Sequence, residues 1–169
     1  RAGRVQVFSK AGNGDWEQIG QNIDAESYQP LGNVFDTSTV LRRLQYFGSS
    51  VSITKVSDVI TLAVGSSWGG QGGMPGVARV FEFEGSNWVQ DGPDIVGNSN
   101  HNSDGLPLEI GLGHSVSINS NKYLAVGIPK DRIETATPTN THDIGSTIVY
   151  EYSPTRDCSA EKAKSQGTQ

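Results

Sequence analysis

The sequence Gly48-Ser49-Ser50-Val51-Ser52-Ile53 returns further along the chain as Gly113-His114-Ser115-Val116-Ser117-Ile118. Each copy is followed by Leu-Ala-Val-Gly, at residues 62–65 and again at residues 124–127. Two elements that recur in the same order are the signature of an internal repeat. The fold is therefore expected to be built from repeated units.

Two further elements belong to the same repeat. The third occurs as Gly-Arg-Val-Gln-Val-Phe at 3–8, Gly-Val-Ala-Arg-Val-Phe at 76–81 and Gly-Ser-Thr-Ile-Val-Tyr at 145–150. The fourth, at 16–23 and 88–95, keeps Trp, Gly and Ile in register. The chain thus begins with elements three and four, continues with a full unit, and ends with elements one, two and three.

All four elements have the features of β-strands. They are short, rich in Val, Ile, Phe and Tyr, and bounded by Gly, Asn, Ser or Asp. Groups of two, four and three elements give nine predicted strands. Adjacent apolar pairs such as Val80-Phe81 and Val149-Tyr150 predict strands that are buried on both faces, as in sheets stacked face to face.

We therefore predict an all-β fold, and a repeated four-stranded unit is typical of a β-propeller blade. The prediction is a partial β-propeller of four-stranded antiparallel blades, about two and a quarter blades in all. Its parts are the last two strands of a blade (1–23), a long inter-blade loop (24–47), a complete blade (48–95), an inter-blade loop (96–112), three strands of the next blade (113–152) and a polar tail (153–169).

Composition and charge exclude several classes of protein. The 169 residues include 13 Lys plus Arg and 18 Asp plus Glu, which gives a net charge of −5. An acidic chain lacks the basic face that a nucleic-acid binder needs. There is no apolar run long enough for membrane insertion and no signal peptide is recognised. Cys158, the single cysteine, has no internal disulfide partner, and its role stays open.

The motifs resemble the FG-GAP β-propeller repeat family, which includes the head domains of integrin α chains. Phe47-Gly48 matches the Phe-Gly that enters strand one, and the Gly-x-Val-x-Val-Phe of strand three appears in the third element. Gly127-Ile128-Pro129 is close to the Gly-Ala-Pro that ends strand two, and Gly65-Ser66-Ser67 is a weaker version. The pattern Trp-x-Gln-x-Gly-x-x-Ile in the fourth element is typical of a microbial and algal branch. The resemblance covers about residues 3–152 and implies an extracellular or cell-surface location.

Nine strands are too few to close a propeller, which needs four or more blades. The two outer sheet faces would expose apolar side chains, so we expect a protein partner or further copies to complete the propeller. The tail is expected to be too polar to replace a fourth strand. Trp16 and Trp88 are predicted to be equivalent buried packing residues, because both are in register with the same Gly and Ile.

Ligand-binding candidates lie in the long loops at 24–46, 65–76, 96–112 and 128–144, because binding residues concentrate on loops that a rigid scaffold positions. The aromatic candidates are Trp68, which follows Ser67 in a Gly-rich loop, and Tyr28. Arg42 and Arg43 form a basic pair that suits a carboxylate. The polar candidates are Asp104, Asp131, His142 and Asp143. Together these loops are acidic, which favours a cationic or carbohydrate ligand.

No metal or other cofactor is predicted. The family often binds calcium in the strand-one-to-two turn, but the turns at 54–58 and 119–122 lack converging carboxylates. His101, Asp104, His142 and Asp143 have no metal-ligand spacing.

No nucleophile elbow or phosphate loop is present either. We expect a non-catalytic module for protein–protein interaction or scaffolding. The alternatives are a glycan-binding module and, less favoured, a glycoside hydrolase-like enzyme with two loop carboxylates.

Overall fold

The computed structural model describes residues 3–25, 46–67, 76–97, 109–121, 123–133, 142–151 and 162–163. All regular structure in these ranges is β-strand, and every strand pair is antiparallel. The prediction of an all-β fold is confirmed. Within these ranges no helix is long and apolar enough to cross a membrane.

The middle sheet is the complete unit expected at 48–95. It is a meander of β5 (Ser50–Val56), β6 (Val59–Ser66), β7 (Val77–Glu84) and β8 (Asn87–Gln90). A short strand, β9 (Ile95–Val96), pairs with the start of β7. The long β5–β6 ladder joins seven residue pairs, so the repeat elements one to four are consecutive neighbours in space.

The third sheet repeats this order. It contains β11 (Ser115–Ile118), β12 (Tyr123–Ile128), β15 (Ser146–Glu151) and β16 (Lys162–Ala163). The tail was expected to add no strand, and this is wrong, because Val149 and Tyr150 of β15 are paired with Ala163 and Lys162. The exposed edge of β15 offers backbone groups, which pair without regard to side-chain polarity.

The first sheet has only elements three and four. β1 (Arg4–Val5) pairs with β4 (Ile23–Asp24), and β2 (Phe8–Lys10) pairs with β3 (Trp16–Gln18). Its register equals that of the middle sheet: Val5 lies opposite Ile23 as Ala78 lies opposite Ile95. The internal repeat read from the sequence is therefore a repeat of strand pairing.

Three short strands lie in segments that we expected to be loops. β10 (Glu109–Ile110) and β14 (His142–Asp143) both pair with β13 (Lys130–Ile133). β13 and β14 continue the β12–β15 hairpin beyond a one-residue shift of register. The shift falls at Pro129, which has no N–H for the ladder and so ends β12. Short strands of this kind raise the number of strands above the predicted nine.

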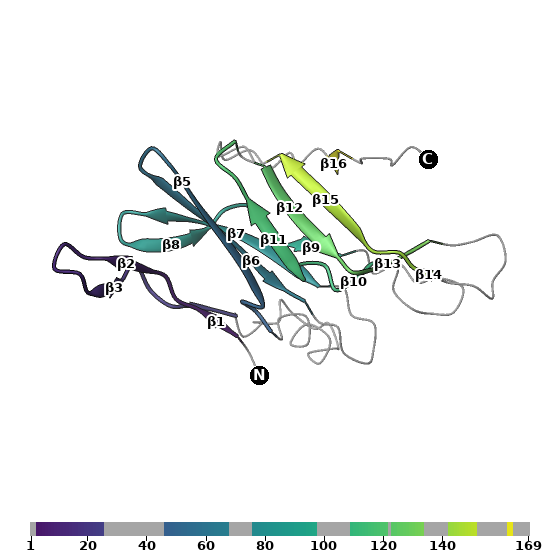
Figure 1. The fold of residues 1–169 in the computed structure, drawn as a ribbon, viewed down its shortest axis with the longest axis horizontal. Helices are drawn as coiled ribbons and strands as arrows, with labels where there is room; N and C mark the ends of the chain where they lie inside the picture. Colours follow the sequence, from purple (N-terminus) through teal and green to yellow (C-terminus); the bar gives the residue numbers. More distant parts are fainter. Residues whose placement is uncertain are drawn as a thin grey trace, which may run out of the picture.

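Figure 1 shows the three units following one another across the molecule, with the middle sheet between the other two. A hydrophobic core lies at each of the two junctions between neighbouring sheets. One joins residues of the first and middle sheets, namely Val5, Ile23, Ala25, Phe47, Leu62, Val64, Phe81 and Trp88. The other joins the middle and third sheets through Ala63, Ala78, Val80, Leu112, Ile118, Leu124, Val126, Ile128 and Tyr150. The prediction of burial on both faces is confirmed for β6 and β7, where Val80 and Phe81 are both buried. It is wrong for Val149 of β15, which is 40% exposed because no described sheet covers the back of the third unit.

We call the face of a sheet that points toward the preceding unit its front, and the opposite face its back. On the middle sheet, Phe81 and Leu62 lie on the front, whereas the smaller Ala63 and Ala78 lie on the back. The alternation follows from the two-residue period of a strand. The larger front side chains Leu124 and Tyr150 of the third sheet thus pack on the small Ala63 and Ala78 of the middle sheet.

Equivalent strands of neighbouring sheets also meet through polar contacts. Ser50 Oγ donates to the Gly113 carbonyl oxygen over 2.8 Å, and the Ile118 N–H donates to Ser52 Oγ over 3.0 Å. Both bonds join β5 to the start of the third unit. The serines that repeat in element one therefore have a structural role, since they satisfy the backbone between two sheets.

Trp88 is the main contact between the outer strands of the first and middle sheets. Its indole Nε1 donates to the Ile19 carbonyl oxygen over 2.9 Å. The Gln21 amide bonds both the N–H and the carbonyl oxygen of Trp88, at 2.8 Å each. The ring lies over Gly20, where an added Cβ would be 2.6 Å from the indole Cδ1. Gly20 thus leaves the space that the ring occupies.

Gly20 and Gly92 are a matched pair that isolates this contact. Both have left-handed backbones, with φ of +74° and +78°, but no described atom lies within 4 Å of a Cβ built on Gly92. We expect Gly92→Ala to cost about 1–2 kcal/mol from backbone strain alone. Gly20→Ala should cost about 1–3 kcal/mol more, because the methyl group overlaps the indole. Urea unfolding of both variants measures the difference, and equal losses would contradict the contact.

Candidate interaction surface

Five of the sequence candidates lie outside the described residues. They are Tyr28, Arg42, Arg43, Trp68 and Asp104. The ligand site predicted in the long loops stays a prediction for them.

The other three candidates come together on one small sheet. Asp131 lies on β13, which pairs with β14, the strand that contains His142 and Asp143. The backbone of Ile144 also donates to the Asp131 carbonyl oxygen over 2.9 Å. Within the described ranges, no group of three or more His, Cys, Asp or Glu residues is arranged to hold a metal ion. The backbone pairing thus brings these three residues onto one sheet.

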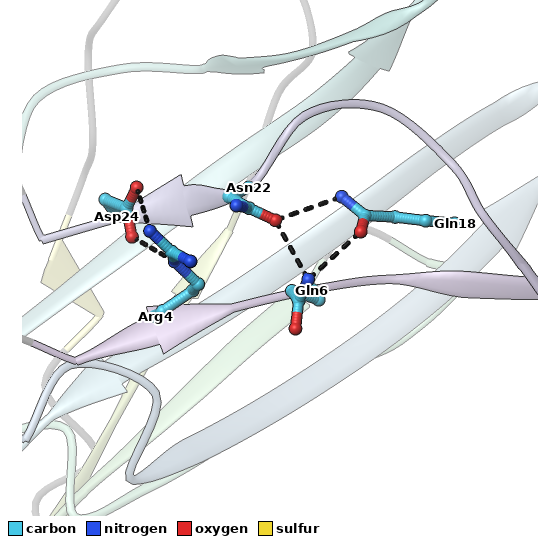
Figure 2. A network of polar contacts seen from close by, with 5 residues as sticks. All are labelled: Arg4, Gln6, Gln18, Asn22 and Asp24. Atoms are coloured by element: carbon cyan, nitrogen blue, oxygen red, sulfur yellow. Dashed lines mark hydrogen bonds and ion pairs between the residues drawn. The ribbon is translucent and has the colours of Figure 1, made fainter.

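A different surface, the front of the first sheet, stands out in the described residues. Figure 2 shows a row of polar side chains along β1, β3 and β4. Gln6 Nε2 donates to Gln18 Oε1 and to Asn22 Oδ1, both at 3.0 Å. Gln18 Nε2 donates in turn to Asn22 Oδ1 and to the Gly20 carbonyl oxygen, both at 3.1 Å. The three amides therefore hold one another in place.

An ion pair ends this row at the start of the sheet. Arg4 Nε and Nη2 donate to the two carboxylate oxygens of Asp24 at 2.6 and 3.1 Å (Figure 2). The hydrogen bond from Arg4 is the main cause that lowers the pKa of Asp24. Both side chains are more than half exposed, so the pair adds orientation and little stability.

The middle sheet contains the same network at the equivalent positions. Gln90 Nε2 donates to the Gly92 carbonyl oxygen and to Asp94 Oδ1, as Gln18 does to Gly20 and Asn22. Arg79 then replaces Gln6, and its Nε and Nη2 bond the Asp94 carboxylate at 2.8 and 2.9 Å. The first sheet thus pairs two neutral amides, Gln6 and Asn22, at the position where the middle sheet pairs two opposite charges, Arg79 and Asp94.

The network could have been found in the sequence. The fourth element reads Gln-x-Gly-x-Asn in one copy and Gln-x-Gly-x-Asp in the other, at residues 18–22 and 90–94. The copy that has Gln6 also has Asn22, and the copy that has Arg79 also has Asp94. Two positions that change together in this way indicate residues in contact. The prediction from sequence used the Trp, Gln, Gly and Ile of this element but not the Asn or Asp that follows, and so missed the network.

Two aromatic side chains extend the row on the first sheet. Phe8 and Trp16 are 47% and 68% exposed, whereas their equivalents Phe81 and Trp88 are 6% and 4% exposed. The prediction that Trp88 is buried is confirmed, and the same prediction for Trp16 is wrong. Trp88 is covered by the first sheet, but no described residue forms a sheet over the front of the first sheet. We call this front the exposed row, made of Arg4, Gln6, Phe8, Trp16, Gln18, Asn22 and Asp24.

No family model, curated protein or solved structure matches the chain.

The two tryptophans provide a test of this difference in burial. We expect Trp88→Ala to lower the free energy of unfolding by about 3–5 kcal/mol, because it removes a buried ring and its hydrogen bond. Trp16→Ala should change it by less than about 0.5 kcal/mol, since most of that side chain contacts water. Urea unfolding at protein concentrations where the chain is monomeric measures both values. Similar losses for the two variants would show that Trp16 is packed.

The coupled exchange of Arg79 and Asp94 predicts a non-additive double substitution. Arg79 is almost fully buried and lies 5.8 Å from the Phe47 ring centre. Asp94→Asn removes its counter-charge and should cost about 1–3 kcal/mol. Adding Arg79→Gln recreates the amide network of the first sheet and should recover part of that loss, with a coupling of about 0.5–3 kcal/mol. Strictly additive losses in chemical unfolding would contradict the pairing.

Proposed function

We propose that this chain is a non-catalytic scaffolding module that forms protein–protein contacts through the faces of stacked sheets. The resemblance to FG-GAP repeats supports the more detailed reading of a partial β-propeller on an extracellular or cell-surface protein. The order of strands in the middle sheet, a meander of four with the next unit on each face, is that of a propeller blade.

The difference between the two copies of one face carries this proposal. On the middle sheet the front is covered by protein, and its Trp88 and Phe81 are buried. On the first sheet the same residue types, in the same register, are exposed. A row of aromatic and hydrogen-bonding side chains on a sheet has the composition of a protein interface, in which a few residues, most often Trp, Tyr or Arg, contribute most of the binding energy.

Glycan binding is the second candidate, and the exposed Trp16 beside polar amides favours it. An indole ring can stack on a sugar while amides and carboxylates bond its hydroxyl groups. However, the amides of Gln6, Gln18 and Asn22 are already paired with one another, which leaves fewer donors for a sugar. The described residues add no support to the glycoside hydrolase-like alternative.

Sedimentation equilibrium and a glycan array distinguish the two candidates. We expect reversible self-association of the chain, because among the described residues apolar side chains are exposed on both outer faces, namely Phe8 and Trp16 on the front of the first sheet and Val149 on the back of the third. Trp16→Ser should weaken the association at least about tenfold, which is about 1.4 kcal/mol. Val59→Ser, at an exposed position on the middle sheet, is the control and should have no effect.

Two outcomes would contradict the proposal. One is a chain that stays monomeric up to about 1 mM, which would limit the contact to about 4 kcal/mol. The other is a glycan that is retained by the chain but lost from Trp16→Ser, which would make the exposed row a lectin site. Turnover of a panel of chromogenic glycosides would instead support an enzyme.

A further inference from the structure

The two internal junctions between sheets follow the same pattern, which identifies the surface that fits the exposed row. In each junction the back of one sheet meets the front of the next. The backbone before element one packs on the third-element glycine of the preceding unit. A Cβ on Gly3 would overlap the Phe47 carbonyl oxygen, and a Cβ on Gly76 would overlap the Leu112 carbonyl oxygen. The junction is therefore a repeated contact.

The fourth strand adds a specific contact for tryptophan. At the first junction, Gly20 makes room for the Trp88 ring and Gln21 bonds its backbone. At the second junction, Gly92 keeps the open position, but Pro93 stands in place of Gln21. No described side chain of the third unit occupies the space beside Gly92. A back face whose fourth strand contains Gly-Gln can therefore accommodate a tryptophan ring from the facing sheet and bond its backbone, as Gly20 and Gln21 do for Trp88.

The exposed row presents the tryptophan without this partner. Trp16 has the register of Trp88, and Gln6, Gln18 and Asn22 repeat the network that the first sheet covers on the middle sheet. The amides are already bonded to one another. Covering them with another sheet leaves their hydrogen bonds intact, which limits the desolvation cost.

We propose that the exposed row binds the back face of another sheet built from this repeat, whose fourth strand contains Gly-Gln. Trp16 packs on the glycine, its indole N–H donates to the carbonyl oxygen before that glycine, and the glutamine amide bonds its backbone. This inference rests on the proposed function and names the partner surface. It requires no ligand, metal or unrelated protein.

An extended chain tests the proposal directly. Residues 46–144 are placed before residues 3–169, so that Ile144 is followed by Gly3, which is the repeat equivalent of Gly145. The added segment supplies a complete sheet and then strands one and two for the first unit. In the added copy, Pro93→Gln creates the Gly-Gln pair. Every element keeps its order and register, and the original chain is present almost in full.

Thiol labelling reports whether the row is covered. In a background with Cys158→Ser, Gln6→Cys is placed in the exposed row and reacted with a thiol reagent. We expect it to react at least about tenfold more slowly in the extended chain than in the 169-residue chain. Asn13→Cys, in the exposed β2–β3 turn, is the matched control and should react equally in both. Gly92→Leu in the added copy should fill the position of Trp16 and restore the fast reaction at Gln6→Cys.

A stability measurement gives a second readout that does not depend on labelling. In the extended chain, Trp16→Ala should lower the urea midpoint about as much as Trp88→Ala lowers it in the 169-residue chain. Equal labelling of Gln6→Cys in the two chains, or an extended chain that does not unfold cooperatively, would overturn the inference. Self-association tests the proposed function in a separate experiment, so failure of one result is distinguishable from failure of the other.

Discussion

The contact between Trp88 and the first sheet fixes how the middle sheet stacks on the first sheet. The indole ring fits over Gly20, donates to the Ile19 carbonyl oxygen and has its own backbone bonded by Gln21. This arrangement fixes the relative position of two outer strands that are far apart in the chain. Beside this contact, the front side chains Phe81 and Leu62 of the middle sheet share a core with Val5 and Ile23 of the first sheet.

Much of this architecture could be predicted from the sequence, because the repeat has the same period as the strand pairing. Strands, their order and the burial of the middle unit on both faces came from the recurrence of Val, Phe and Gly in register. The β13–β14 extension could not be found this way, since in the described residues it is seen only in the third unit and depends on a change of register near Pro129. β16 was missed because Lys162 and Ala163 have no strand-like pattern, and backbone pairing at an edge does not require one.

The exposure of Trp16 could not be predicted, because burial depends on a neighbouring sheet and the local sequence is the same as at Trp88. The repeat indicated that each sheet face packs on a neighbouring sheet, but not whether that neighbouring sheet is formed by the described residues. The residues of the candidate site were also hard to predict, for a different reason. Loop residues such as Trp68 and Arg42 drew attention by type alone, whereas the amide network was hidden in residues that look ordinary. Only the coupled exchange of Gln6–Asn22 for Arg79–Asp94 distinguishes it.

That exchange also bears on what the exposed row is built for. On the middle sheet the Arg79 side chain is buried, and it is compensated by two hydrogen bonds to the partly exposed Asp94 and by the Phe47 ring beside its guanidinium. On the first sheet the same place has neutral amides, and the charged pair Arg4–Asp24 is shifted to the end of the strands. Neutral groups that are already bonded to one another lose little when a second surface removes water from them. A surface that remains solvated does not need internally bonded amides, and charged side chains at its centre would make it more soluble. Along the row, the neutral amides lie between the Arg4–Asp24 pair at one end and Phe8 and Trp16 at the other. Charges confined to one margin support the proposal of a protein interface, because the rim of such an interface is polar and charged residues are depleted from its core.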